Sequence, residues 1–97
     1  MSQSLFHFQL QGDFVAKKAL EVKQALHHLI EQGHHNLLLD LTSVNDVDIA
    51  GINALAGAYK KLRAREGHLE LKVARNSPLA RMLHITKFDL LLPTTVQ

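Results

Sequence analysis

Four segments of the chain carry the apolar and polar patterns of β-strands. Apolar and polar residues alternate over residues 6–11 and again over residues 69–73, which predicts two strands with one wet face each, the first of them at residues 4–11. Residues 36–41 are almost continuously apolar, a pattern typical of a strand that is covered on both faces or central in a sheet. The turn-rich residues 42–48 predict a loop, and the three leucines at 90–92 predict a last short strand.

Helical patterns fill the gaps between these strands. Apolar residues recur at steps of three and four over residues 15–30, which predicts an amphipathic helix that Asp13 can cap. Residues 52–62 repeat this pattern and predict a second helix. Ser77 and Pro78 then form a typical helix start, with serine as the N-cap and proline in the first helical position.

The order of these elements predicts the fold class. Strands and helices alternate, which is typical of an α/β domain with a four-stranded, mostly parallel sheet, about three helices and right-handed crossovers. If the alternation in the first and third strands is real, their wet faces point one way and the helices gather on the other side. A length of 97 residues is that of one domain.

Composition and charge indicate what kind of protein this is. Apolar residues make up 46% of the chain and charged residues 21%, which are ordinary values for a globular protein. The chain has no cysteine, no apolar run long enough to span a membrane and no secretory signal at its first residues, so we expect a cytoplasmic protein that is not embedded in a membrane. The net charge of +2 is too small to indicate a nucleic-acid partner.

The side chains that could support catalysis do not form a known motif. Seven histidines are present, but none has the spacing of a metal site, and no glycine-rich phosphate loop or nucleophile elbow occurs, so we expect no metal and no cofactor. Asp40, Asp46 and Asp48 fall where the carboxyl end of a strand places functional groups. They permit three interpretations, which are loop structure with Asp48 as a helix cap, recognition of a partner, and catalysis.

The segment that contains these aspartates resembles the signature of the STAS domain (sulfate transporter and anti-sigma factor antagonist). In that family a buried strand ends in Asp-Leu, and after a loop Asp-Ser-Ser-Gly-Leu or a variant opens a helix, as Asp40-Leu41 and residues 48–52 do here. Residues 10–14, 77–83 and 86–93 resemble further family motifs in the same order. The resemblance covers residues 4–93 and implies a STAS-like fold.

The resemblance implies a protein that docks onto partners and is not an enzyme. In the best-known members the domain binds a serine-kinase anti-sigma factor and frees the sigma factor, and phosphorylation of the first Ser or Thr after the Asp breaks that docking. Here Ile49 occupies the phosphorylated position, and it has no hydroxyl group. Thr42 and Ser43 lie nearby and carry hydroxyls, although the resemblance does not imply their modification.

The residues alone leave the orientation of Ile49 open. It either extends the buried stripe of the second helix or lies exposed at the helix start, where an apolar side chain is a natural interface anchor. If it is exposed, we expect a partner-binding surface around it. That surface comprises Asp46, Asp48, Ile49, Ala50, Gly51 and Asn53.

Three functions remain open at this stage. The first is a stand-alone anti-sigma factor antagonist-like domain that docks onto an anti-sigma factor or serine-kinase-like regulator in transcription control. The second rests on the Asp-x-Ala-Gly form of residues 48–51, which is similar to cytoplasmic STAS subunits that bind the ATPase of lipid-transporting ABC systems. The third is a module that binds a small ligand or nucleotide.

The resemblance also bears on domain organisation. Residues 1–97 read as one STAS-like domain that lacks the extra N-terminal strand and the C-terminal helix of many members. An absent first strand leaves a sheet edge with unpaired backbone groups, so a homodimer is a further expectation.

Overall fold

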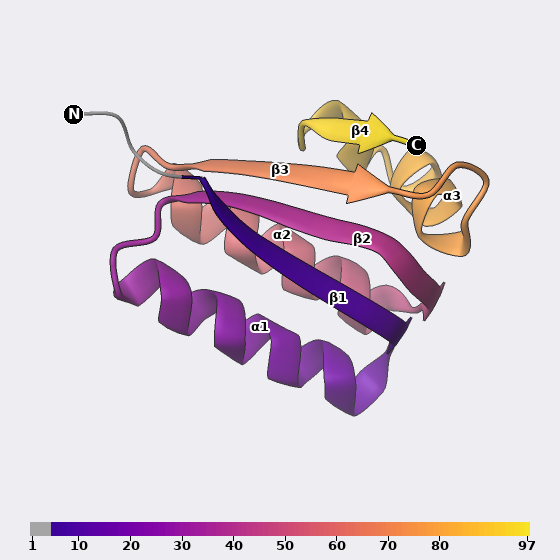
Figure 1. Ribbon diagram of the computed structural model, residues 1–97, viewed down its shortest axis with the longest axis horizontal. Helices are drawn as coiled ribbons and strands as arrows, with labels where there is room; N and C mark the ends of the chain where they lie inside the picture. Colours follow the sequence, from indigo (N-terminus) through magenta and orange to yellow (C-terminus); the bar gives the residue numbers. More distant parts are fainter. Residues whose placement is uncertain (1–4) are drawn as a thin grey trace.

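A computed structural model describes residues 5–97 as alternating strands and helices (Figure 1). The elements are β1 (Phe6–Phe14), α1 (Ala16–Glu31), β2 (Asn36–Val47), α2 (Ile49–Arg63), β3 (His68–Val73), α3 (Pro78–Ile85), a short 3-10 helix η1 (Phe88–Leu90) and β4 (Thr94–Val96). Ser4, the first residue of the strand predicted at 4–11, lies outside the described residues. The predicted α/β class with three α-helices is confirmed.

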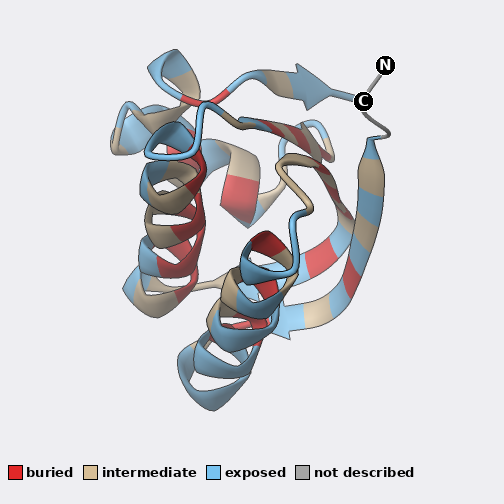
Figure 2. Ribbon diagram, turned by 90° about the vertical axis from the view of Figure 1, so that its left-hand side faces the viewer, coloured by how far each residue is buried: buried red, intermediate tan, exposed pale blue. Residues whose placement is uncertain are grey.

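The four strands form one sheet in the order β1-β2-β3-β4, and every neighbouring pair is parallel. Helices α1 and α2 lie next to each other against one face of this sheet (Figures 1 and 2). Helix α3 contacts β2 and the 3-10 helix. Because parallel strands all end at the same edge of a sheet, the turns that start the three α-helices gather at that edge.

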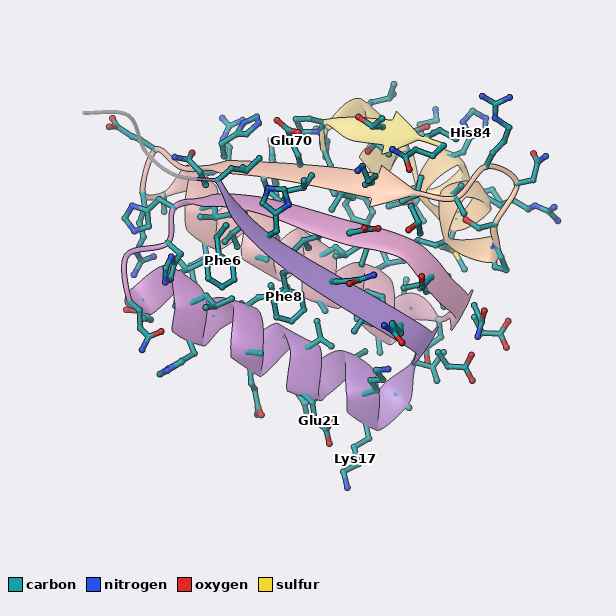
Figure 3. All side chains as sticks on the ribbon, in the orientation of Figure 1. Phe6, Phe8, Lys17, Glu21, Glu70 and His84 are labelled. Carbon is teal, nitrogen blue, oxygen red and sulfur yellow. The ribbon has the colours of Figure 1, made fainter. Side chains whose placement is uncertain are left out.

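The covered face of the sheet forms the core. Leu37, Leu39 and Leu41 of β2 are buried, and the interior is completed by apolar residues of α1 and α2 (Figure 2). Phe6 and Phe8 point from β1 toward α1, where they are half-buried against this core (Figure 3). The prediction that the helices gather on one side is therefore confirmed.

The opposite face of the sheet is the wet face of the first and third strands, as predicted. The strand register aligns its side chains in two rows, His7 with Leu38 and Glu70, and Gln9 with Asp40 and Lys72. All six are exposed or half-buried. The second strand is central in the sheet, but it is covered on one face only.

Three boundaries predicted from the sequence are wrong. Residues 42–47 are not a loop, because they continue β2 by pairing with residues 11–14 of an equally extended β1. Asp13 therefore lies inside a strand, and Val15 is the N-cap of α1, without a side-chain hydrogen bond.

The last strand is also displaced from its predicted position. The leucines at 90–92 end the 3-10 helix and the turn that follows, so only Leu92 reaches the core. The strand itself follows Pro93, whose carbonyl oxygen accepts a hydrogen bond of 2.8 Å from the amide of Leu71. Ser77 is confirmed as the N-cap of α3, because its hydroxyl accepts a hydrogen bond from the amide of Ala80.

Candidate functional site

Asp48 joins the starts of two helices. Its Oδ1 atom accepts a hydrogen bond of 3.1 Å from the amide of Gly51, which confirms the predicted cap of α2. Its Oδ2 atom accepts a second hydrogen bond of 3.1 Å from the amide of Ala16, the first residue of α1. One carboxylate therefore satisfies free amides at two helix N-termini, where negative charge is favourable.

Gly51 allows α2 to start close to the end of β1. A Cβ atom on this buried glycine would lie 2.5 Å from the carbonyl oxygen of Phe14 and 2.8 Å from Cγ2 of Val47. Neither distance is possible for a real side chain, so only glycine fits without a shift of the helix. The glycine of the motif thus has a packing role.

Ile49 points away from the core at the first turn of α2. Its side chain is 62% exposed, whereas that of Ile52 is 0% exposed. Asn53, one helical turn later, is also exposed, and Ala50 is half-buried against the core. Of the two orientations that the sequence left open for Ile49, the structure has the exposed one.

The three aspartates of the segment do not converge on one centre. Asp46 is exposed, and its backbone amide donates a hydrogen bond of 3.4 Å to Oδ1 of Asp13. Asp40 lies on the open face of the sheet, where its Oδ1 accepts hydrogen bonds from the hydroxyl (2.6 Å) and the amide (3.1 Å) of Thr42. These bonds hold the pKa of Asp40 below its ordinary value. Within residues 5–97, no three His, Asp or Glu side chains are placed to hold a metal ion.

An apolar groove lies beside α3, and the sequence did not predict it. Its volume is about 280 Å³, and Pro78, Met82 and the largely exposed Ile85 line it together with Arg81. It lies on the helix that follows the carboxyl end of β3. The apolar positions of this short helix were visible in the sequence, but the pattern does not say which of them remain uncovered.

Comparison with known families identifies the family of this chain. A family model described as the STAS domain matches residues 2–96. The chain belongs to the STAS domain family. No curated protein matches this STAS domain.

Solved structures share the fold of this STAS domain at low sequence identity. The structure of the anti-sigma factor antagonist SpoIIAA in its unphosphorylated form is similar with a TM-score of 0.71 and 16% identity, over 98% of this chain and 82% of that one. A proposed anti-sigma factor antagonist from Thermotoga maritima gives a TM-score of 0.71 and 14% identity, over 92% and 73%. None of the helices in residues 5–97 is long and apolar enough to cross a bilayer.

Proposed function

We propose that this STAS domain is a non-enzymatic docking protein of the anti-sigma factor antagonist type, acting in partner switching. The observation that carries the proposal is the exposure of Ile49 at the start of α2. A rigid, branched apolar side chain in water at a helix start has no role in the core. It is suited to fill a pocket of a partner.

The surroundings of Ile49 define the surface that we propose. Asp48, Ala50 and Gly51 fix the backbone of the helix start, while Asp46 and Asn53 are exposed beside it. The surface therefore offers one apolar anchor with a carboxylate and an amide close by. A fitting partner presents an apolar pocket with hydrogen-bond donors at its rim.

The same geometry suggests that docking is not switched off by phosphate at this position. Isoleucine has no hydroxyl, and the amides of Gly51 and Ala16 are already bound by the carboxylate of Asp48. Thr42 uses its hydroxyl to donate to Asp40, and the exposed Ser43 lies in β2, six residues before Ile49. We therefore propose a domain that is permanently in its docking-competent form.

The partner that we favour is an anti-sigma factor or serine-kinase-like regulator in the cytoplasm. The support for this choice is the STAS fold shared with an anti-sigma factor antagonist and the position of Ile49 within it. Such a partner connects the domain to the regulation of transcription.

Affinity capture from the native cell lysate tests this proposal, with retained proteins read by mass spectrometry. The test variant is Ile49→Asp, since a carboxylate in the first turn of a helix is tolerated by the fold but opposes an apolar pocket. The matched control is Leu20→Asp, because Leu20 is a similarly exposed apolar residue, at 55%, on α1. We expect wild type and Leu20→Asp to retain the same kinase-like regulator and Ile49→Asp to lose it. Equal retention by all three forms would contradict the proposed surface.

A second candidate function follows from the Asp48-x-Ala50-Gly51 segment. It is similar to the corresponding segment of STAS subunits that support lipid-transporting ABC systems. Capture of a transporter ATPase in place of a kinase-like regulator, with the same dependence on Ile49, would favour this candidate.

A homodimer paired along the open edge of β1 stays a prediction, and sedimentation of the purified chain tests it.

A further inference from the structure

A cavity of about 190 Å³ lies at the end of α2, far from the docking surface. Its apolar walls come from Leu62 of α2, Leu69 of β3 and the pair Leu91 and Pro93 before β4. Tyr59 is the first residue of α2 that lines the cavity, and it follows Ile49 by ten residues, which is about 15 Å at the usual helical rise. The cavity is therefore independent of the surface proposed for docking.

The rim of this cavity carries one positive charge without a negative partner. The guanidinium of Arg63 donates a hydrogen bond of 3.0 Å to the hydroxyl of Tyr59, and its carbon lies 5.8 Å from the centre of the Tyr59 ring. Within residues 5–97 no carboxylate pairs with Arg63, whereas His68 at the same rim lies 3.0 Å from Oε1 of Glu70. A guanidinium has five N–H donors, so Arg63 retains donors for an anion.

We propose that this cavity binds a small organic acid, a monocarboxylate whose apolar part is about the size of a benzene ring. An enclosed apolar cavity of about 150 Å³ holds benzene, and this cavity, which is open to solvent on one side, has about 190 Å³, so its volume accommodates such a group. The side chain of Leu91 is 56% exposed, and a bound ring covers part of it. The carboxylate then reaches the guanidinium of Arg63, which matches a carboxylate in geometry and charge.

Titration with sodium benzoate, followed by amide chemical shifts in NMR spectra, tests this inference. We expect saturable shifts in the millimolar range at His68, Leu69 and Leu91, and none at Ile49. Benzamide, which has the same shape without the charge, should bind at least about tenfold more weakly.

Two variants separate specific binding from general attraction to a basic helix end. Arg63→Gln should remove the preference for benzoate over benzamide. Lys60→Gln is the matched control, because Lys60 is an exposed cation of the same helix that does not line the cavity, and it should bind benzoate as wild type does. Absent or unsaturable shifts, or equal weakening by both variants, would overturn the proposal. Neither result bears on docking at Ile49.

Discussion

Gly51 stands where α2 meets the end of β1, and its missing side chain decides how closely the two elements approach. A Cβ atom at this position would meet backbone, which cannot move aside as the end of a flexible side chain can. Gly57, in the same helix, differs in this respect. A Cβ atom there would make ordinary contacts of 3.5 Å with Cε of Lys23 and 3.6 Å with Nε2 of His27.

These two glycines give a matched pair of substitutions. We expect Gly51→Ala to lower the free energy of unfolding by about 1–3 kcal/mol, because the helix start must shift away from Phe14. Gly57→Ala should leave it unchanged or raise it by up to about 1 kcal/mol, because alanine favours the helix. Urea denaturation measures both values. Equal effects of the two substitutions would show that Gly51 is not held by the contact with β1.

His27 is a second residue whose surroundings predict a measurable effect. It lies where α1 packs on α2, and its Nε2 atom is buried with no hydrogen-bond partner within residues 5–97. Burial of the ring and then the positive charges of Lys61 and Lys23 hold its pKa below the ordinary value of 6.5, while Glu31 acts in the opposite direction.

The direction of this shift fixes how stability depends on pH. The unfolded chain binds a proton at His27 at higher pH than the folded chain does, so the free energy of unfolding falls as the pH drops below about 6.5. We expect His27→Gln to flatten this dependence between about pH 7 and pH 5. His28→Gln, at the exposed neighbouring position, should keep the wild-type slope. Parallel curves for wild type and His27→Gln would rule out His27 as the source.

Among the elements, the sequence predicted each of the three α-helices and the first three strands, but not the 3-10 helix or where the strands end. The stripe of α2 and the alternation of β3 are local patterns, and both are confirmed. Residues 42–47 are polar and turn-rich, yet they pair with residues 11–14 because the neighbouring strand extends equally far. Such pairing depends on a partner distant in the sequence, so local pattern could not reveal it.

The last strand shows the same limit in another form. Three consecutive leucines at 90–92 have the composition of a buried strand. Lys87 adopts a left-handed backbone conformation, with φ of 62°, and is the N-cap of the 3-10 helix, which ends at Leu90, while Leu91 is its C-cap. Pairing with β3 is then left to residues 94–96.

The junction of α1 and α2 depends on Asp48, whose role as a cap the sequence predicted and whose contact with Ala16 it did not. We expect Asp48→Ala to lower the free energy of unfolding by about 0.5–2 kcal/mol, since it leaves amides of two helix starts without their acceptor. Hydrogen exchange should quicken at both Ala16 and Gly51. Asp46→Ala is the control, because this exposed carboxylate caps neither helix, and it should change stability by less than about 0.5 kcal/mol. Unchanged exchange at Ala16 in Asp48→Ala would contradict the bridging role.

At the scale of the whole molecule, helices cover one face of the sheet and leave the other open (Figure 2). Adjacent leucines of β2 report on this asymmetry, because Leu39 is buried on the covered face and Leu38 is half-buried on the open one. We expect Leu39→Ala to lower the free energy of unfolding by about 2–5 kcal/mol and Leu38→Ala by less than about 1.5 kcal/mol. Equal losses of unfolding free energy in the two variants would mean that Leu38 is as deeply buried as Leu39 and that the open face is also covered.

The candidate site could be located from the sequence, but its geometry could not. The STAS signature indicated residues 48–52, and the structure describes them at the predicted helix start. The exposure of Ile49 was undecided, because an apolar residue three positions before Ile52 fits the buried stripe as well as the solvent-facing turn. In the structure Gly51 packs against Phe14 and Ile52 is buried, and with this rotation of the helix start Ile49 faces the solvent.

We propose that the domain docks onto its partner through Ile49. The most direct measurement is a binding isotherm between the purified chain and the purified regulator that it captures, for wild type, Ile49→Asp and Leu20→Asp, with melting curves to confirm that all three fold. We predict that Ile49→Asp weakens binding at least about thirtyfold, as loss of a central anchor does, while Leu20→Asp stays close to wild type. An Ile49→Asp variant that is folded and binds as tightly as wild type would contradict docking through Ile49.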